Sequence, residues 1–172
     1  MSLRTILIHP DARLRKKCDL VKNFDLKLKN LTQDMLETMY DAPGIGLAAP
    51  QIGVMLQVFV MDCAIKDEEP NPLILINPSI LWHSEETSIH SEGCLSIPEQ
   101  YEEVTRPKSV KISFQNVMGV VNEISFEGIE ATCAQHEIDH LNGKLFIDYL
   151  SSLKKKMITD KMKKLKRELA RK

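Results

Sequence analysis

Hydrophobic residues recur with helical spacing in three parts of the chain. The first part predicts a helix over Leu26–Tyr40, with Asp25 as its N-cap. The second predicts a helix from Gly128 to Asn142, with Gly143 capping its C-terminus. The third begins near Ser151 and continues almost to Lys172. The apolar stripe of the first helix consists of Leu28, Leu31, Met35 and Met39, and that of the last consists of Ile158, Met162, Leu165 and Leu169.

Shorter apolar or alternating segments predict β-strands, and two of them flank Met118-Gly119 as a hairpin. The expected strands are Thr5–His9, Leu56–Asp62, Leu73–Asn77, Ser109–Asn116 and Val120–Phe126. A polar loop is expected over Lys66–Pro72. Because strands and helices are segregated along the chain, the pattern favours an α+β fold with mainly antiparallel sheet.

The composition fits one globular domain. The chain has 172 residues, of which 43% are hydrophobic and 27% charged, and no apolar run approaches the ~18–20 residues of a membrane span. The N-terminus lacks a secretory signal, so we expect a cytoplasmic protein. The cysteines are dispersed, as expected for thiols in a reducing compartment; they are Cys18, Cys63, Cys94 and Cys133.

The strongest chemical signal is H-E-x-x-H at residues 136–140, on the second predicted helix. Side chains four residues apart share a helical face, about 6 Å apart along the axis, so His136 and His140 can bind one metal ion. Glu137 can lie beside the ion as a base for water. A salt-bridged pair of helical histidines is the alternative interpretation.

A catalytic metal site of this kind needs a third protein ligand. The extended metalloprotease pattern is excluded because Phe146 stands where its third histidine belongs. Cys133 lies about 10 Å along the helix from His140, so it is expected in the wall of the site or in the core. The remaining candidates are Cys94, His9, His83 and His90, and Cys94 has the best context because Gly93 precedes it.

A third segment, Gly44–Gln51, loosely matches a dinucleotide-binding fingerprint. It follows a helix rather than a strand, and Pro50 prevents a helix from starting there, so a phosphate-binding loop is disfavoured. Its small residues indicate backbone packed closely against another group. Gln51 offers an amide that could donate to a developing oxyanion.

Together these segments resemble the peptide deformylases. The matching stretches are Gly-Ile-Gly-Leu-Ala-Ala-Pro-Gln (44–51), Glu-Gly-Cys-Leu-Ser (92–96) and Gln-His-Glu-Ile-Asp-His (135–140), in the family's order and approximate spacing. The likeness continues through residues 143–151 and the basic tail. The resemblance implies removal of the formyl group from formyl-methionyl nascent peptides. It also implies mixed, mainly antiparallel sheets around the central motif-bearing helix, followed by a C-terminal helix.

The resemblance also implies individual roles. The metal ligands would be Cys94, His136 and His140, with Glu137 as the catalytic acid and base. Gln51 and the backbone N–H of Leu95 would stabilise the oxyanion. The candidates for the substrate pocket are Ile45, Gly46, Ile129 and Cys133. The metal would be ferrous iron, replaceable by zinc, nickel or cobalt.

Two differences from the family concern substrate binding. Tyr101 stands where many relatives have a basic residue, and Arg106 is a possible substitute. The stretch Ile89–Ser91 is about one residue longer than usual. Two other functions stay open: a different metallohydrolase, such as a peptidase, and a non-catalytic ribosome-binding relative with a structural metal.

The net charge of −1 conceals an uneven distribution. Residues 154–172 contain ten Lys or Arg and two acidic residues, a charge of +8, whereas residues 1–153 contain thirteen and twenty-two, a charge of −9. We therefore divide the chain into a catalytic domain, 1–153, and a basic helical extension, 154–172. Such a basic run favours phosphate backbones, and the resemblance implies docking on the ribosome near the nascent-chain exit.

Overall fold

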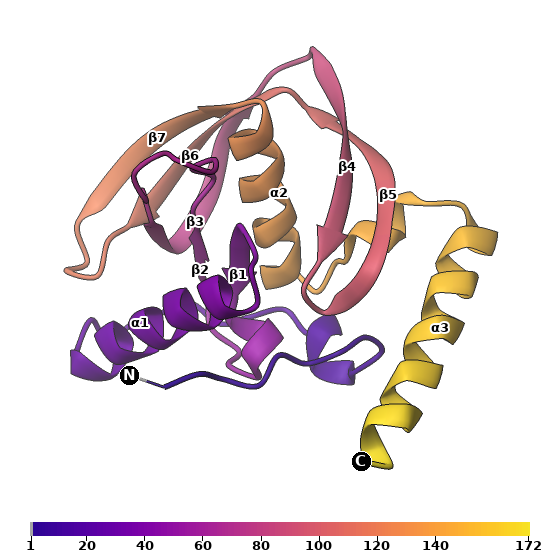
Figure 1. Ribbon diagram of the computed structural model, residues 1–172. Helices are drawn as coiled ribbons and strands as arrows, with labels where there is room; N and C mark the ends of the chain where they lie inside the picture. The colour runs from indigo at the N-terminus through magenta and orange to yellow at the C-terminus, as the bar shows by residue number, and fades with distance from the viewer. Residues whose placement is uncertain (1) are drawn as a thin grey trace.

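The computed structural model describes residues 2–172 and contains two antiparallel sheets on either side of a central helix (Figure 1). The larger sheet has the strand order β1-β2-β3-β6-β7, and the smaller pairs β4 with β5. The strands are β1 Gly46–Ala48, β2 Val58–Met61, β3 Leu73–His83, β4 Thr87–Cys94, β5 Ile97–Pro107, β6 Ser109–Gln115 and β7 Val121–Glu127. Every ladder in the described residues is antiparallel, and an isolated parallel bridge joins Asp19 to Leu56. The predicted α+β fold is confirmed.

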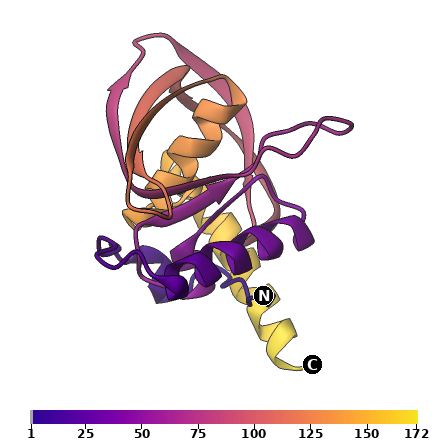
Figure 2. The same ribbon diagram turned by 90° about the vertical axis from the view of Figure 1, so that its left-hand side faces the viewer.

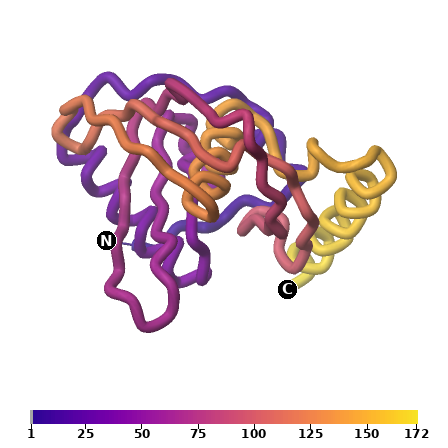
Figure 3. Tube along the Cα trace, turned by 90° about the horizontal axis from the view of Figure 1, so that it is seen from above, coloured from indigo at the N-terminus to yellow at the C-terminus, as the bar shows by residue number. Residues whose placement is uncertain are grey.

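Helix α2, Ile129–Leu141, lies between the two sheets (Figure 3). Most of its side chains are buried, including the polar Thr132, Gln135, His136, Glu137 and His140. Ala131, Ala134 and Ile138 belong to the core that the helix shares with the larger sheet, and the small alanines permit close approach. The predicted C-terminal cap is confirmed, because Gly143 adopts φ +74° directly after the helix.

Helix α1, Leu26–Asp41, packs on β1 and β2. Asp25 caps it as predicted, since its carboxylate accepts from the Leu28 N–H at 3.1 Å. The predicted apolar face is confirmed, because Leu28, Leu31, Met35 and Met39 are all buried.

Helix α3, Ser152–Ala170, packs against the body near its start, and its far end extends outward (Figures 1 and 2). Ile158 and Met162 are buried in a core with Leu14, Val104 and Phe146. Burial lowers the pKa of His9 to about 4, and its neutral ring lies 2.9 Å from the Thr159 hydroxyl. The predicted stripe is confirmed at its first two positions and only partly at Leu165. It is wrong at Leu169, which is 51% exposed.

Some strand predictions are wrong. Thr5–His9 is extended but joins no sheet; its backbone makes single bonds from Leu7 to Gln51 and from His9 to Ser96. Strands β1, β4 and β5 were not expected, because β1 is short and charged residues interrupt the pattern of the other two. The polar loop after β2 is confirmed and projects from the body (Figure 2).

Three short 3₁₀ helices complete the part of the chain that the structure describes: η1 Ala12–Arg15, η2 Ala49–Ile52 and η3 Phe146–Tyr149. Among residues 2–172, no helix combines the length and the apolar character needed to cross a lipid bilayer.

Candidate metal centre and active site

Three potential metal ligands from two elements meet in the interior. His136 and His140 lie one turn apart on α2, and Cys94 ends β4. The Nε2 atoms of the histidines are 3.2 Å apart, and the Cys94 Sγ lies 3.3 Å from His140 Nε2. The three ligand atoms lie within 4.8 Å of one another. This donor set fits a transition metal, because imidazole and thiolate both bind such ions well.

The other candidates for the third ligand lie elsewhere. His9 contacts Thr159, His90 Nδ1 is 2.8 Å from the Thr132 hydroxyl, and His83 is exposed. The structure therefore brings only Cys94, of the four candidates, to the paired histidines.

The orientation of His136 is set by a buried ionic network. Its Nδ1 lies 3.0 Å from Glu92 Oε1, which leaves Nε2 facing the other ligands. Glu92 in turn accepts two hydrogen bonds from Arg106, at 2.6 and 2.9 Å. Burial alone would raise the pKa of Glu92, but its bonds to His136 and Arg106 hold the pKa below its ordinary value. Carboxylates that orient ligand histidines are common behind metal sites.

The network continues on α2 and η3. Arg106 Nη1 donates to Asp139 at 2.9 Å, and the same carboxylate oxygen accepts from the Tyr149 hydroxyl at 2.7 Å. The guanidinium also lies 4.8 Å from the centre of the Tyr149 ring. Sequence reasoning missed these roles, because the pairing of β4 with β5 was not predicted. The one available signal was that each metal motif contains a further acidic residue, Glu92 in the first and Asp139 in the second.

Glu137 follows the first histidine and is buried, so burial raises its pKa to about 7 against the opposing influence of His136. Its Oε2 has no hydrogen-bond partner among the described residues. A carboxyl with such a pKa can both accept and release a proton near neutral pH.

Gln51, in η2, lies beside Cys94. Its Oε1 accepts from the Ala48 N–H at 2.9 Å, which directs its amide nitrogen toward Ser96 Oγ at 3.1 Å and Cys94 Sγ at 3.5 Å. The amide that the sequence singled out therefore donates beside the thiol ligand. Leu95 directly follows that ligand, and its side chain packs on Gly44.

A cavity of about 560 Å³ opens beside these groups. All four residues predicted for the substrate pocket line it: Ile45, Gly46, Ile129 and Cys133. A Cβ at Gly46 would lie 2.5 Å from Glu137 Oε1 and 2.9 Å from Cys133 Sγ. Only glycine lets β1 approach α2 this closely without moving the Glu137 carboxyl.

Comparison with known proteins identifies the family. The model of the polypeptide deformylase family matches residues 3–156. The chain belongs to the peptide deformylase family. It is 51% identical over 168 residues to the peptide deformylase of Bartonella henselae, covering 98% of this chain and 96% of that protein.

Solved deformylases have the same fold. The crystal structure of the Legionella pneumophila enzyme superposes with a TM-score of 0.91 at 46% identity and covers 99% of both chains. The Ehrlichia chaffeensis enzyme in complex with actinonin superposes with a TM-score of 0.92 at 38% identity, covering 97% of this chain and 99% of that one. As a deformylase, this chain is a metal-dependent hydrolase that removes the N-terminal formyl group from formyl-methionyl nascent polypeptides and releases formate.

The structure shows where the two departures from the usual deformylase sequence lie. Tyr101 packs its ring on Gly93 and lines the cavity, whereas Arg106 is buried and already paired with two carboxylates. Arg106 therefore does not replace the missing basic residue. The stretch Ile89–Ser91 pairs regularly with β5, and the register shifts only between Glu92 and Cys94.

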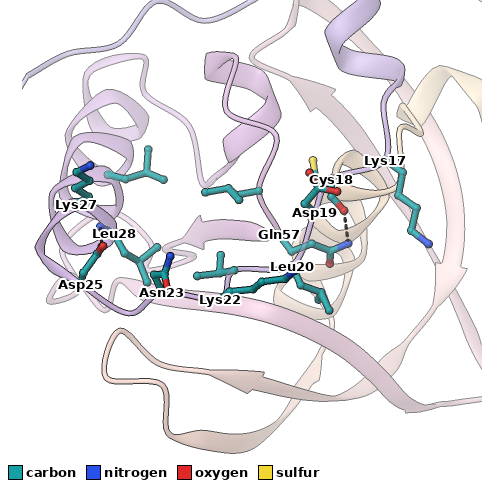
Figure 4. Close-up of a pocket in the computed structure, with 13 residues that line it drawn as sticks. Lys17, Cys18, Asp19, Leu20, Lys22, Asn23, Asp25, Lys27, Leu28 and Gln57 are labelled. Carbon is teal, nitrogen blue, oxygen red and sulfur yellow. Dashed lines mark hydrogen bonds between the residues drawn. The ribbon is translucent and has the colours of Figure 1, made fainter.

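A second cavity, of about 1010 Å³, lies between the segment that precedes α1, residues 17–25, and α1 itself (Figure 4). Leu28 and Leu31 form part of its apolar wall. At one side of the cavity, the Gln57 side-chain amide donates a hydrogen bond to the Cys18 carbonyl. None of the predicted deformylase site residues lines this cavity.

Replacing Glu92 tests the support of His136. Glu92→Gln keeps the shape but removes the charge that holds the imidazole, so we expect metal affinity to fall by about 10–100-fold. Competition with a chelator measures this loss. Glu103→Gln, an exposed position on the same strand pair, is the matched control and should leave affinity unchanged. Unaltered metal affinity in the Glu92 variant would contradict the assigned role.

Replacing Gly46 tests the close approach of β1 to α2. In Gly46→Ala the new methyl displaces the carboxyl group of Glu137, so we expect kcat for deformylation to fall by about 100-fold with metal retained. Thermal unfolding should change little, because Gly46 has no positive φ and a side-chain end can move. A variant with unchanged kcat would show that the contact is unimportant.

Proposed function

We propose that Cys94, His136 and His140 hold the catalytic ion of this deformylase and that Glu137 transfers the protons. The observation that carries this proposal is the convergence of three ligand atoms within 4.8 Å, beside a buried carboxyl with an unpartnered oxygen. When bound, the ion would acidify water and polarise the formyl carbonyl.

The other groups act on the substrate. Glu137 takes a proton from the attacking water and delivers it to the departing amine, because its raised pKa suits both steps. Gln51 Nε2 and the backbone N–H of Leu95 donate to the oxyanion of the tetrahedral intermediate. The methionine side chain enters the cavity bounded by Ile45, Gly46, Ile129 and Cys133.

We further propose that actinonin binds in this cavity. The support is the Ehrlichia chaffeensis deformylase that was crystallised with actinonin and that shares the fold over nearly its whole length. The resident ion is proposed to be ferrous iron, for which zinc, nickel or cobalt can substitute. A thiolate ligand makes such an iron site sensitive to oxidation, so anaerobic handling matters.

Formate release tests the residue roles. With formyl-Met-Ala-Ser as substrate under anaerobic conditions, Glu137→Gln should lose at least ~100-fold in kcat while keeping its metal. Glu130→Gln, an exposed position on the same helix, is the control and should match the unaltered enzyme. Formate and metal content are measured on the same samples, which also identifies the ion.

Other outcomes separate the competing functions. Internal cleavage of the unformylated peptide without formate release would favour a peptidase. Loss of metal in Glu137→Gln, with no activity in the unaltered protein, would favour a non-catalytic relative with a structural metal.

We propose that residues 1–153 form the catalytic domain and that residues 154–172 form an extension that docks on the ribosome in the cytoplasm. The support is the +8 charge of this segment and the position of α3, whose outer half carries exposed Lys163, Lys164 and Arg167. Ile158 and Met162 anchor the helix to the core, so deleting it would also damage the body. Charge removal is therefore the cleaner test.

The triple variant with Lys163, Lys164 and Arg167 changed to Gln should bind ribosomes at least ~10-fold more weakly and show a shallower salt dependence. Hydrolysis of small formyl peptides should stay unchanged. Replacing exposed Lys22, Lys27 and Lys29 by Gln removes the same charge from another surface and serves as the control. Sedimentation with ribosomes at several salt concentrations measures the effect, and equal weakening in both variants would argue against a dedicated basic helix.

A further inference from the structure

Two cysteines outside the proposed metal ligands lie close together in the core, and one of them, Cys133, lines the cavity. Cys133, on α2, is buried and lines the cavity, whereas Cys63, just after β2, is half-buried. Cys63 packs against the core cluster that contains Cys133, and each thiol shifts the pKa of the other. The proposed deformylase mechanism uses Cys133 only as a wall residue and does not use Cys63.

The backbone around them explains why they meet. The Ile45 carbonyl accepts from the Asp62 N–H at 2.9 Å and from the Cys133 thiol at 3.6 Å. This shared acceptor holds the end of β2 against α2, so Cys63, the next residue after Asp62, comes to lie beside Cys133. The backbone of Ile45 thus fixes the positions of both Cys133 and the residue before Cys63.

The two thiols are chemically unequal. The neighbouring Cys133 thiol lowers the pKa of Cys63 below its ordinary value, while the proximity of Cys63 and burial raise the pKa of Cys133 well above its own. Cys63 is also the more exposed of the two. A partly exposed thiol of lowered pKa beside a protonated partner is the arrangement found in peroxide-sensitive pairs.

We propose that Cys63 and Cys133 form a reversible disulfide when the enzyme meets a peroxide, and that this disulfide weakens binding of the methionine side chain. The Cys63 thiolate attacks the peroxide and breaks its O–O bond, giving a sulfenic acid and, after protonation, water. The Cys133 sulfur then attacks the Cys63 sulfur, the S–O bond breaks and a second water leaves with the Cys133 proton. Two thiols are oxidised and one peroxide is reduced to two waters.

The consequence for the cavity follows from the contacts of Cys133. Its Sγ touches the Ile45 carbonyl and would lie 2.9 Å from a Cβ at Gly46, so it forms part of the wall itself. A disulfide places the sulfurs about 2.05 Å apart. Cys133 must therefore move toward Cys63 and away from this wall. The effect on substrate binding rests on the pocket role proposed above, whereas formation of the disulfide does not.

Peptide mapping tests the disulfide directly. The nickel-loaded enzyme is treated with hydrogen peroxide, alkylated and digested with trypsin without reduction. The four cysteines fall in separate tryptic peptides, and the pair lies in peptides 30–66 and 112–144. We expect these two peptides to be cross-linked and to separate on reduction with dithiothreitol. Absence of this link, or a link through Cys94 in its place, would overturn the proposal whether or not the enzyme releases formate.

Kinetics test the consequence. Peroxide should raise the KM of the unaltered enzyme for formyl-Met-Ala-Ser by about ten-fold, the effect of a modest change in an apolar pocket, and dithiothreitol should restore it. Cys63→Ser should keep the basal KM and resist peroxide, whereas Cys18→Ala, which removes a thiol outside the pair, should respond like the unaltered enzyme. A reversible rise in KM of equal size in Cys63→Ser, or an unchanged KM in cross-linked enzyme, would overturn the coupling to the pocket.

Discussion

The buried ion pair between Glu92 and Arg106 is the constraint on which the rest of the site depends. Both side chains are 4% exposed, and the pair joins β4 to β5 at two hydrogen bonds. Removing one partner of such a pair leaves the other charge buried, which commonly costs about 3–5 kcal/mol. The pair also reaches α2 through His136 and Asp139, so it ties the small sheet to the central helix. Ligand geometry and fold are therefore stabilised by the same contacts.

This connection explains how distant segments produce one centre. Helix α2 supplies both histidines and Glu137 on a rigid scaffold, and the β4–β5 pair supplies Cys94. Segment 44–51 packs against both, with Gly46 in contact with Glu137 and Gln51 donating toward the Cys94 thiol. His136 and Gln51 are held in place by buried hydrogen bonds. Such preorganisation is what electrostatic stabilisation of a transition state requires.

The same packing also limits what each surface can do. Cys133 is both a core residue of α2 and a lining residue of the cavity beside the candidate metal site, so a change at its sulfur would alter the wall of that cavity. Helix α3 is similarly divided: its middle part is anchored through Ile158, Met162 and the bond between Thr159 and His9. Its second half presents basic side chains to solvent. Anchoring and charge thus occupy different parts of one helix.

Local sequence determined the helices and the motif chemistry. Apolar spacing and the capping residues Asp25 and Gly143 specified α1 and α2, because helical periodicity and caps act within a few residues. The spacing of His136 and His140 likewise determined that both face one point. Only the tertiary structure decided that Cys94, and not His9, His83 or His90, joins them. That choice depends on the pairing of β4 with β5. The charged residues of these strands interrupt the alternating pattern by which a strand is predicted from sequence, and Glu92 and Arg106 can be buried only because they form an ion pair. The contact between Cys63 and Cys133 is also tertiary, because it joins residues seventy positions apart through the packing of β2 on α2.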